Sequence, residues 1–117
     1  RALSLNVLDC LQSPVGHLQE LSRVLAPSGS AALCSPYDWS EAATPFASWI
    51  GGHSQRGTDA GDSAVRLRHP LSTSGEVPGL AIECEREHVP WRVRLHDRCR
   101  LEYDVHLLGL RRHSTPP

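Results

Sequence analysis

The sequence has 117 residues and a formal net charge of −1, with 39% apolar and 21% charged residues. This length and composition suit one globular domain with a single modest core. The small net charge argues against a nucleic-acid or membrane-surface role driven by bulk charge, and no apolar run is long enough to span a membrane. The four cysteines form no C-x-x-C pair, and Cys10 and Cys34 lie in apolar segments, which favours reduced thiols and a cytoplasmic location.

The first third of the sequence predicts a strand, a helix and a second strand. Residues 2–8 have the apolar pattern of a buried strand, and Ser13-Pro14 is a typical helix start for an apolar face that continues through residue 25. Pro27-Ser28-Gly29 would end this helix, and residues 30–34 form a short apolar run typical of a parallel strand. We expect a βαβ unit with a right-handed crossover. Because the sequence begins inside an apolar run, we also interpret it as a fragment of a longer protein.

The remaining sequence predicts an antiparallel addition to that unit. Residues 53–79 are polar and rich in glycine and proline, with a weakly periodic helix around residues 61–72. From residue 80 to residue 107 apolar and polar residues alternate, which predicts two or three strands, the last pair joined near residues 97–100. The acidic residues in this stretch suit the solvated face of an edge strand, namely Glu83, Glu85 and Glu87.

Residues 35–52 concentrate four of the six aromatic residues of the chain, which are Tyr37, Trp39, Phe46 and Trp49. The loop directly follows the second predicted strand, and open α/β sheets bind ligands at the carboxyl ends of their strands. Loops of this kind often carry function, so we expect a binding site here. The alternative is that the rings cover the edge of the core, and Trp49 suits either role.

Residues 6–37, NVLDCLQSPVGHLQELSRVLAPSGSAALCSPY, resemble the second half of a class I S-adenosylmethionine-dependent methyltransferase. Residues 36–52 and 90–98 (PWRVRLHDR) are similar to signatures of the 4-mercaptohistidine N1-methyltransferases of ovothiol biosynthesis. The resemblance implies an α/β fold, the C-terminal half of a Rossmann-like sheet with parallel strands, a flanking helix and a C-terminal antiparallel pair. Residues 1–113 would form this partial domain and residues 114–117 a disordered tail.

The resemblance also implies a function. The protein would methylate a small-molecule acceptor, a thiohistidine-like imidazole, with S-adenosylmethionine as the cofactor. No glycine-rich loop follows a strand in this sequence, so the chain would supply the acceptor-binding half and lack the cofactor-binding half. Asp38, Trp91 and Cys99 depart from the family's pattern, which leaves a different small acceptor open. The sequence does not decide the oligomeric state. The alternative is a non-catalytic binding or regulatory module built on the same half-fold.

Candidate binding residues follow from the chemistry of methyl transfer, which requires a flat acceptor held in line with the methyl group. Rings could sandwich the acceptor, and arginine forks could hold its carboxylate. The candidates are Tyr37, Trp39, Trp49, Arg94, His96 and Arg98, with Asn6 facing the cofactor. Each of these residues also has a purely structural alternative. Arg94 could be a solvated residue of a strand, and Arg98 could form an ion pair in a turn. His96 could be a surface residue, and Asn6 could simply end the strand.

A metal site is the competing arrangement. Cys84, His88, His96 and Cys99 give a C-x3-H-x7-H-x2-C spacing of the residue types that zinc prefers. Strand alternation would nevertheless place His96 and Cys99 on unlike faces, and no tight C-x-x-C knuckle is present. We therefore expect no metal site.

Overall fold

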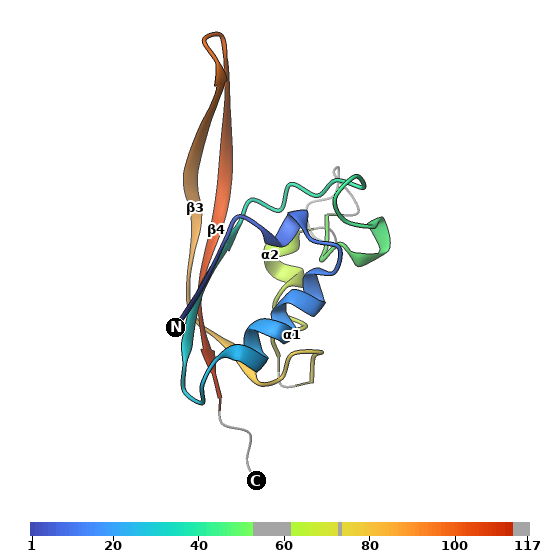
Figure 1. Ribbon diagram of the computed structural model, residues 1–117, viewed down its shortest axis with the longest axis vertical. Helices are drawn as coiled ribbons and strands as arrows, with labels where there is room; N and C mark the ends of the chain where they lie inside the picture. The colour runs from blue at the N-terminus through green and yellow to red at the C-terminus, as the bar shows by residue number, and fades with distance from the viewer. Residues whose placement is uncertain (53–61, 73, 114–117) are drawn as a thin grey trace.

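The computed structural model describes residues 1–52, 62–72 and 74–113. Its elements are β1 (Ala2–Leu5), the 3-10 turn η1 (Leu8–Cys10), α1 (Pro14–Val24), β2 (Ser30–Ser35), the 3-10 turn η2 (Phe46–Ser48), α2 (Ser63–Arg66), β3 (Leu80–His96) and β4 (Cys99–Arg112) (Figure 1). The predicted tail, residues 114–117, lies outside the described residues. Among those residues no helix is long and apolar enough to cross a membrane.

The strands form one mixed sheet in the order β1-β2-β4-β3. β1 and β2 are parallel, whereas β4 is antiparallel to both β2 and β3. The predicted α/β class, with a parallel pair followed by an antiparallel pair, is therefore confirmed. β1 ends at Leu5 rather than at residue 8 because Asn6 adopts a left-handed backbone conformation, with φ of 58°.

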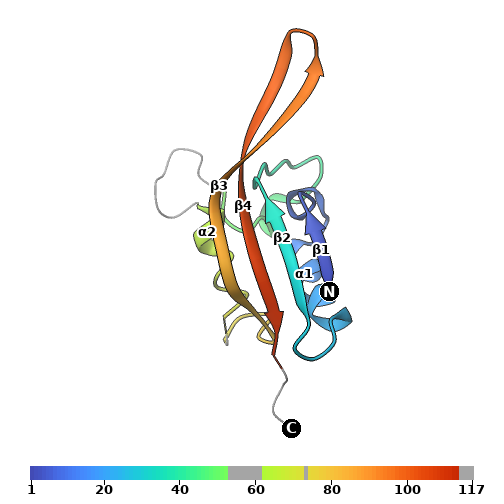
Figure 2. The ribbon, with the colours of Figure 1, turned by 90° about the vertical axis from the view of Figure 1, so that its left-hand side faces the viewer.

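The second half of the sequence forms two long strands joined by a turn at residues 97–98, which confirms the predicted final pair and its junction. Of the two or three strands expected, the two-strand alternative holds, because residues 80–96 form a single strand. β3 passes through Pro90 because it is an edge strand, where a missing backbone N–H costs little. Register shifts, including the one between Arg86 and Val89, let β3 stay paired with β4 over its length. β2 pairs with β4 only as far as His106, so the outer part of β3 and β4 is a two-stranded ribbon that projects beyond the sheet (Figures 1 and 2).

The helix predicted from residue 14 is confirmed as α1. The Ser13 hydroxyl oxygen accepts a hydrogen bond from the Gly16 backbone N–H at 3.1 Å, and Pro14 occupies the first turn. Leu18 and Leu21 are buried against the sheet, which confirms the predicted apolar face. Of the helix expected around residues 61–72, only the single turn of α2 is regular.

Both helices cover the same face of the sheet, and Figure 2 shows the sheet from its other face. The covered face carries the core, in which Leu33, Leu108 and Leu110 are fully buried. On the uncovered face Leu3 is 74% exposed and Leu5 is 51% exposed. All four cysteines are free thiols; Cys34 is buried as expected, whereas Cys10 is exposed.

Candidate functional site

The two parallel strands end in unusual backbone conformations. Asn6 follows β1 with φ of 58°, and Tyr37 follows β2 with φ of 54°. Asparagine often adopts this left-handed conformation, but an aromatic residue rarely does. The Ser35 hydroxyl helps to hold the turn by accepting a hydrogen bond from the Tyr37 backbone N–H at 3.0 Å. Such conformations concentrate at functional sites, and here they mark the carboxyl edge of the parallel pair as a candidate site.

Asp9 fixes the aromatic loop to this edge. Its side chain is buried, and its carboxylate accepts a hydrogen bond from the Asp38 backbone N–H at 2.7 Å. The buried Thr44 hydroxyl donates to the Leu11 carbonyl oxygen at 2.6 Å, within the same segment. Sequence reasoning missed Asp9 as a site residue, although an acidic residue directly after a predicted strand is a usable signal.

The rings of the aromatic loop pack mainly on one another. Trp39 lies between Tyr37 and Trp49, with ring centroids 6.4 and 6.2 Å away, and Phe46 packs against Trp49 at 4.9 Å. Trp39 is 8% exposed, and its indole N–H donates to the Ser63 hydroxyl at 2.8 Å. The structure therefore places Trp39 in the core, where it does not offer a ring face to a ligand.

A small cavity of about 120 Å³ opens at the ends of β1 and β2. It is lined by Asn6, Asp9, Cys10, Pro36, Asp38, Trp91 and Tyr103. Trp91 from β3 and Tyr103 from β4 stack at 5.0 Å with an angle of 27° between their planes. A cationic group would suit this cavity, because a cation is attracted both to the carboxylates and to the faces of the aromatic rings. A flat group would suit it because such a group can stack on the rings. We call this the strand-end cavity.

The titratable neighbours of these carboxylates remain neutral donors. Partial desolvation of this mainly exposed side chain and the adjacent Asp9 carboxylate raise the pKa of the Cys10 thiol. Partial burial and the Asp38 carboxylate raise the pKa of the Tyr103 phenol, which is hydrogen-bonded to Asp38. The strand-end cavity therefore combines negative charge with hydrogen-bond donors and contains no thiolate or phenolate near neutral pH.

Arg94, His96 and Arg98 lie at the tip of the β3–β4 ribbon and do not meet the aromatic loop (Figure 1). The exposed Arg94 side chain pairs with Asp97, and the Arg98 backbone N–H donates to His96 Nδ1 at 3.2 Å. The expected joint site of the aromatic loop and this arginine segment is therefore not formed. The reason is the continuous β3 strand, which carries residues 94–96 outward along the ribbon.

The cysteine and histidine residues of the metal-like spacing are also dispersed. Cys84 lies opposite Gly109 within the sheet, whereas His96 lies opposite Cys99 at the ribbon tip. At a rise of about 3.3 Å per residue, β3 separates Cys84 from His96 by roughly 40 Å. These residues cannot share one ion.

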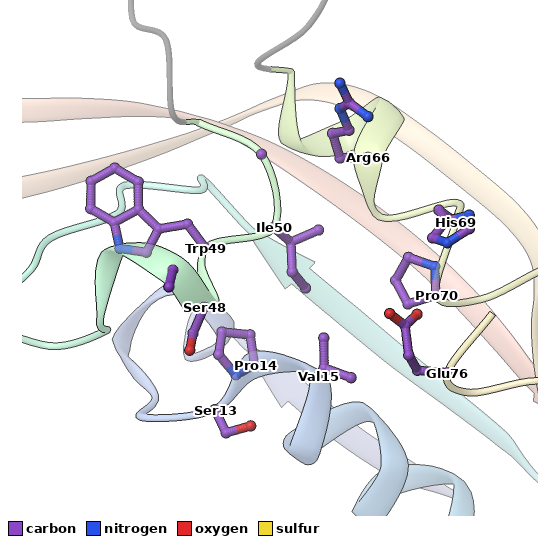
Figure 3. Close-up of a pocket in the computed structure, with 12 residues that line it drawn as sticks. Ser13, Pro14, Val15, Ser48, Trp49, Ile50, Arg66, His69, Pro70 and Glu76 are labelled. Atoms are coloured by element: carbon purple, nitrogen blue, oxygen red, sulfur yellow. The ribbon is translucent and has the colours of Figure 1, made fainter.

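A larger cavity of about 480 Å³ lies in the helical layer (Figure 3). The cavity is lined by side chains from three segments of the chain. They are Pro14 and Val15 at the start of α1, Trp49 and Ile50 from the aromatic loop, and Arg66, His69, Pro70 and Glu76. The half-buried Trp49 donates its indole N–H to the Thr44 carbonyl oxygen at 2.9 Å. Of the three loop rings predicted to bind substrate, Trp49 is thus the one that borders a cavity of this size.

His106 forms a polar cluster that sequence reasoning missed. Its ring is 3% exposed, Nδ1 lies 2.7 Å from the Tyr37 hydroxyl, and Nε2 lies 2.8 Å from a Glu85 oxygen and 3.2 Å from a Glu87 oxygen. Hydrogen bonds from Arg68 and His106 hold the pKa of Glu85 below its usual range. Burial, followed by the charge of Glu87, raises the pKa of Tyr37.

This cluster corrects one prediction in part. β3 is the edge strand that its acidic residues suggested, but Glu85 and Glu87 approach a buried histidine instead of only facing water. Alternation in the sequence grouped His106 with the polar face of β4. In the structure His106 lies two residues before Leu108, on the buried face, which the alternation alone did not reveal.

No protein-family model and no curated protein matches this sequence.

Proposed function

We propose that this chain is the acceptor-binding part of an S-adenosylmethionine-dependent methyltransferase that N-methylates a small, thiohistidine-like imidazole. The observation that carries the proposal is the strand-end cavity, where Asp9 and Asp38 lie beside the stacked rings of Trp91 and Tyr103. The α/β sheet, with its parallel pair followed by an antiparallel pair, agrees with the fold that the sequence resemblance implies.

The cavity suits the chemical groups of a histidine-like acceptor. Its volume of about 120 Å³ is several times the ~10–15 Å³ that a cavity needs to hold one water molecule, which is enough for a small polar head group or part of a ring. The carboxylates of Asp9 and Asp38 match an acceptor ammonium group, and the Trp91 and Tyr103 rings match a flat imidazole. This arrangement replaces the arginine segment as the expected binding partner of the acceptor.

The reaction requires little acid–base catalysis from the protein. An imidazole nitrogen is largely neutral near pH 7, so its lone pair can attack the methyl carbon without a strong base. The described residues supply what remains, which is orientation of the ring and exclusion of water. The neutral Cys10 and Tyr103 side chains beside Asp9 and Asp38 are consistent with a site that positions its substrate instead of deprotonating it.

S-adenosylmethionine, when bound, supplies the methyl group on a sulfonium centre. We expect Asn6 to contact it, because Asn6 directly follows β1 and lines the strand-end cavity. Its side-chain oxygen accepts a hydrogen bond from the Cys34 thiol at 3.3 Å, which leaves the amide N–H groups for a ligand. One such contact is not a complete cofactor site. We expect the other contacts to come from protein outside these 117 residues.

The outer edge of β1 supports this view. β1 is an edge strand of the sheet, and two of its side chains, Leu3 and Leu5, are more than half exposed. An exposed edge with apolar side chains is normally covered or paired in a native protein. Additional strands beside β1 would bring a cofactor-binding segment next to Asn6.

The test is a methyl-transfer assay on the complete protein that contains this chain. The protein is incubated with S-adenosylmethionine labelled in the methyl group and, separately, with 4-mercaptohistidine, histidine or cysteine. We expect label on a ring nitrogen of 4-mercaptohistidine, less with histidine and none with cysteine, because cysteine lacks the imidazole. Transfer to cysteine but to neither imidazole would contradict the proposal.

A further inference from the structure

The side chain of His106 is held more rigidly than a surface histidine would be. It extends from β4 at the last position that pairs with β2, opposite Ser35, and it is 3% exposed. The Tyr37 hydroxyl lies 2.7 Å from Nδ1. Hydrogen bonding at one ring nitrogen fixes the orientation of the ring and leaves the other nitrogen to one partner. That other nitrogen, Nε2, points toward β3.

Two carboxylates from β3 meet Nε2. The Nε2 atom lies 2.8 Å from Glu85 Oε2 and 3.2 Å from Glu87 Oε1. These three atoms lie within 4.8 Å of one another. Two ligand atoms that are each about 2.1 Å from a tetrahedral zinc ion lie about 3.4 Å apart. The Nε2–Oε1 distance of 3.2 Å to Glu87 is close to this spacing, and the 2.8 Å distance to Glu85 has to open by a few tenths of an ångström for both carboxylates to bind one ion.

The surrounding charges leave room for a cation. Arg68 contacts the other oxygen of Glu85, Oε1, at 2.5 Å, so Oε2 is directed to His106. With a neutral imidazole, the carboxylates of Glu85 and Glu87 and the guanidinium of Arg68 sum to one negative charge. Glu87 is 44% exposed at its side chain, which gives an ion a path from solvent. The cluster therefore has three ligands, an orienting shell and an entrance.

We propose that His106, Glu85 and Glu87 bind one divalent transition-metal ion of the zinc kind. The imidazole nitrogen favours such an ion over magnesium or calcium, which prefer oxygen ligands throughout. Tyr37 and Arg68 are positioning residues that orient His106 and Glu85. The site is distinct from the dispersed cysteine–histidine spacing, and it does not depend on the proposed methyl transfer.

The test is calorimetric titration of the chelator-treated protein with Zn²⁺. We expect one ion per chain, and we expect Glu87→Gln and Glu85→Gln each to weaken binding at least tenfold, since loss of even an outer-shell partner costs about 10–100-fold. Two matched controls should keep the affinity of the unmodified protein. Glu83→Gln removes a carboxylate of the same strand, β3, and this carboxylate pairs with Arg111. His88→Gln removes an exposed histidine side chain that pairs with Asp104.

A second measurement, the melting temperature with and without Zn²⁺, distinguishes loss of metal binding from misfolding of the variant. Glu87 is partly exposed, so Glu87→Gln should keep the metal-free melting temperature while losing the rise that Zn²⁺ gives the unmodified protein. Tyr37→Phe keeps the ring and should weaken Zn²⁺ binding without abolishing it. The proposal is overturned if the protein binds no Zn²⁺, or if Glu83→Gln or His88→Gln removes binding and Glu87→Gln does not.

Discussion

Replacing Asp38 by asparagine is expected to raise the KM for the imidazole acceptor about 10-fold to 100-fold, with little change in kcat. A hydrogen bond to a charged group contributes about 1.5–3 kcal/mol, and each 1.4 kcal/mol is a factor of ten. The effect should appear in KM and not in kcat, because Asp38 would bind the acceptor with the same strength in the ground state and in the transition state. Asp38→Asn keeps the backbone N–H that donates to Asp9, so the loop should stay in place.

Steady-state kinetics of the complete protein, with acceptor concentration varied at saturating cofactor, measure this effect. Glu41→Gln is the matched control, because Glu41 is an exposed acidic residue of the same loop and does not line the strand-end cavity. An Asp38→Asn protein with an unchanged acceptor KM would remove Asp38 from the binding site.

Replacing Trp39 by alanine is expected to lower the free energy of unfolding by about 3–5 kcal/mol, the usual cost of truncating a buried large aromatic residue. Trp39 is 8% exposed, packs with Tyr37 and Trp49, and donates to the Ser63 hydroxyl. Trp91 is 39% exposed, and Trp91→Ala should cost only about 1 kcal/mol, roughly the worth of its stacking with Tyr103.

Chemical denaturation of the two variants separates a core ring from a ligand-binding ring. The expected pattern is a large stability loss for Trp39→Ala, and for Trp91→Ala a small loss combined with weakened acceptor binding. If Trp39→Ala were nearly as stable as the unmodified protein and failed to bind the acceptor, Trp39 would be a ligand residue and its assignment to the core would be wrong.

Local signals in the sequence were sufficient for the first half of the fold. The Ser13-Pro14 helix start, the leucine spacing of α1 and the short run of residues 30–34 each reflect interactions between near neighbours in the chain. The same logic located the loop after β2, because four aromatic residues directly follow a strand. These features predict elements well since few distant contacts decide them.

Long-range pairing decided what the sequence could not predict. The alternation allowed either one or two strands between residues 80 and 96, and the structure forms one, because cross-strand pairing with β4 adjusts by register shifts. That continuity moved Arg94 and Arg98 to the ribbon tip and brought Trp91 and Tyr103 to the strand-end cavity instead. The pairing of β3 with β4 also shifts register between Arg86 and Val89, and Glu87 of the His106 cluster lies within this shift. Alternation in the sequence alone does not reveal such a shift.

We expect the acceptor to bind in the strand-end cavity. The three tryptophans report on three different places, since Trp91 borders that cavity, Trp49 borders the larger one, and Trp39 lies in the core. The most direct measurement is an NMR titration of the indole N–H signals with the acceptor, assigned by single Trp→Phe variants. We expect the Trp91 signal to shift while the Trp39 signal stays in place. A shift of the Trp49 signal with the Trp91 signal unchanged would place the acceptor in the larger cavity and would contradict binding in the strand-end cavity.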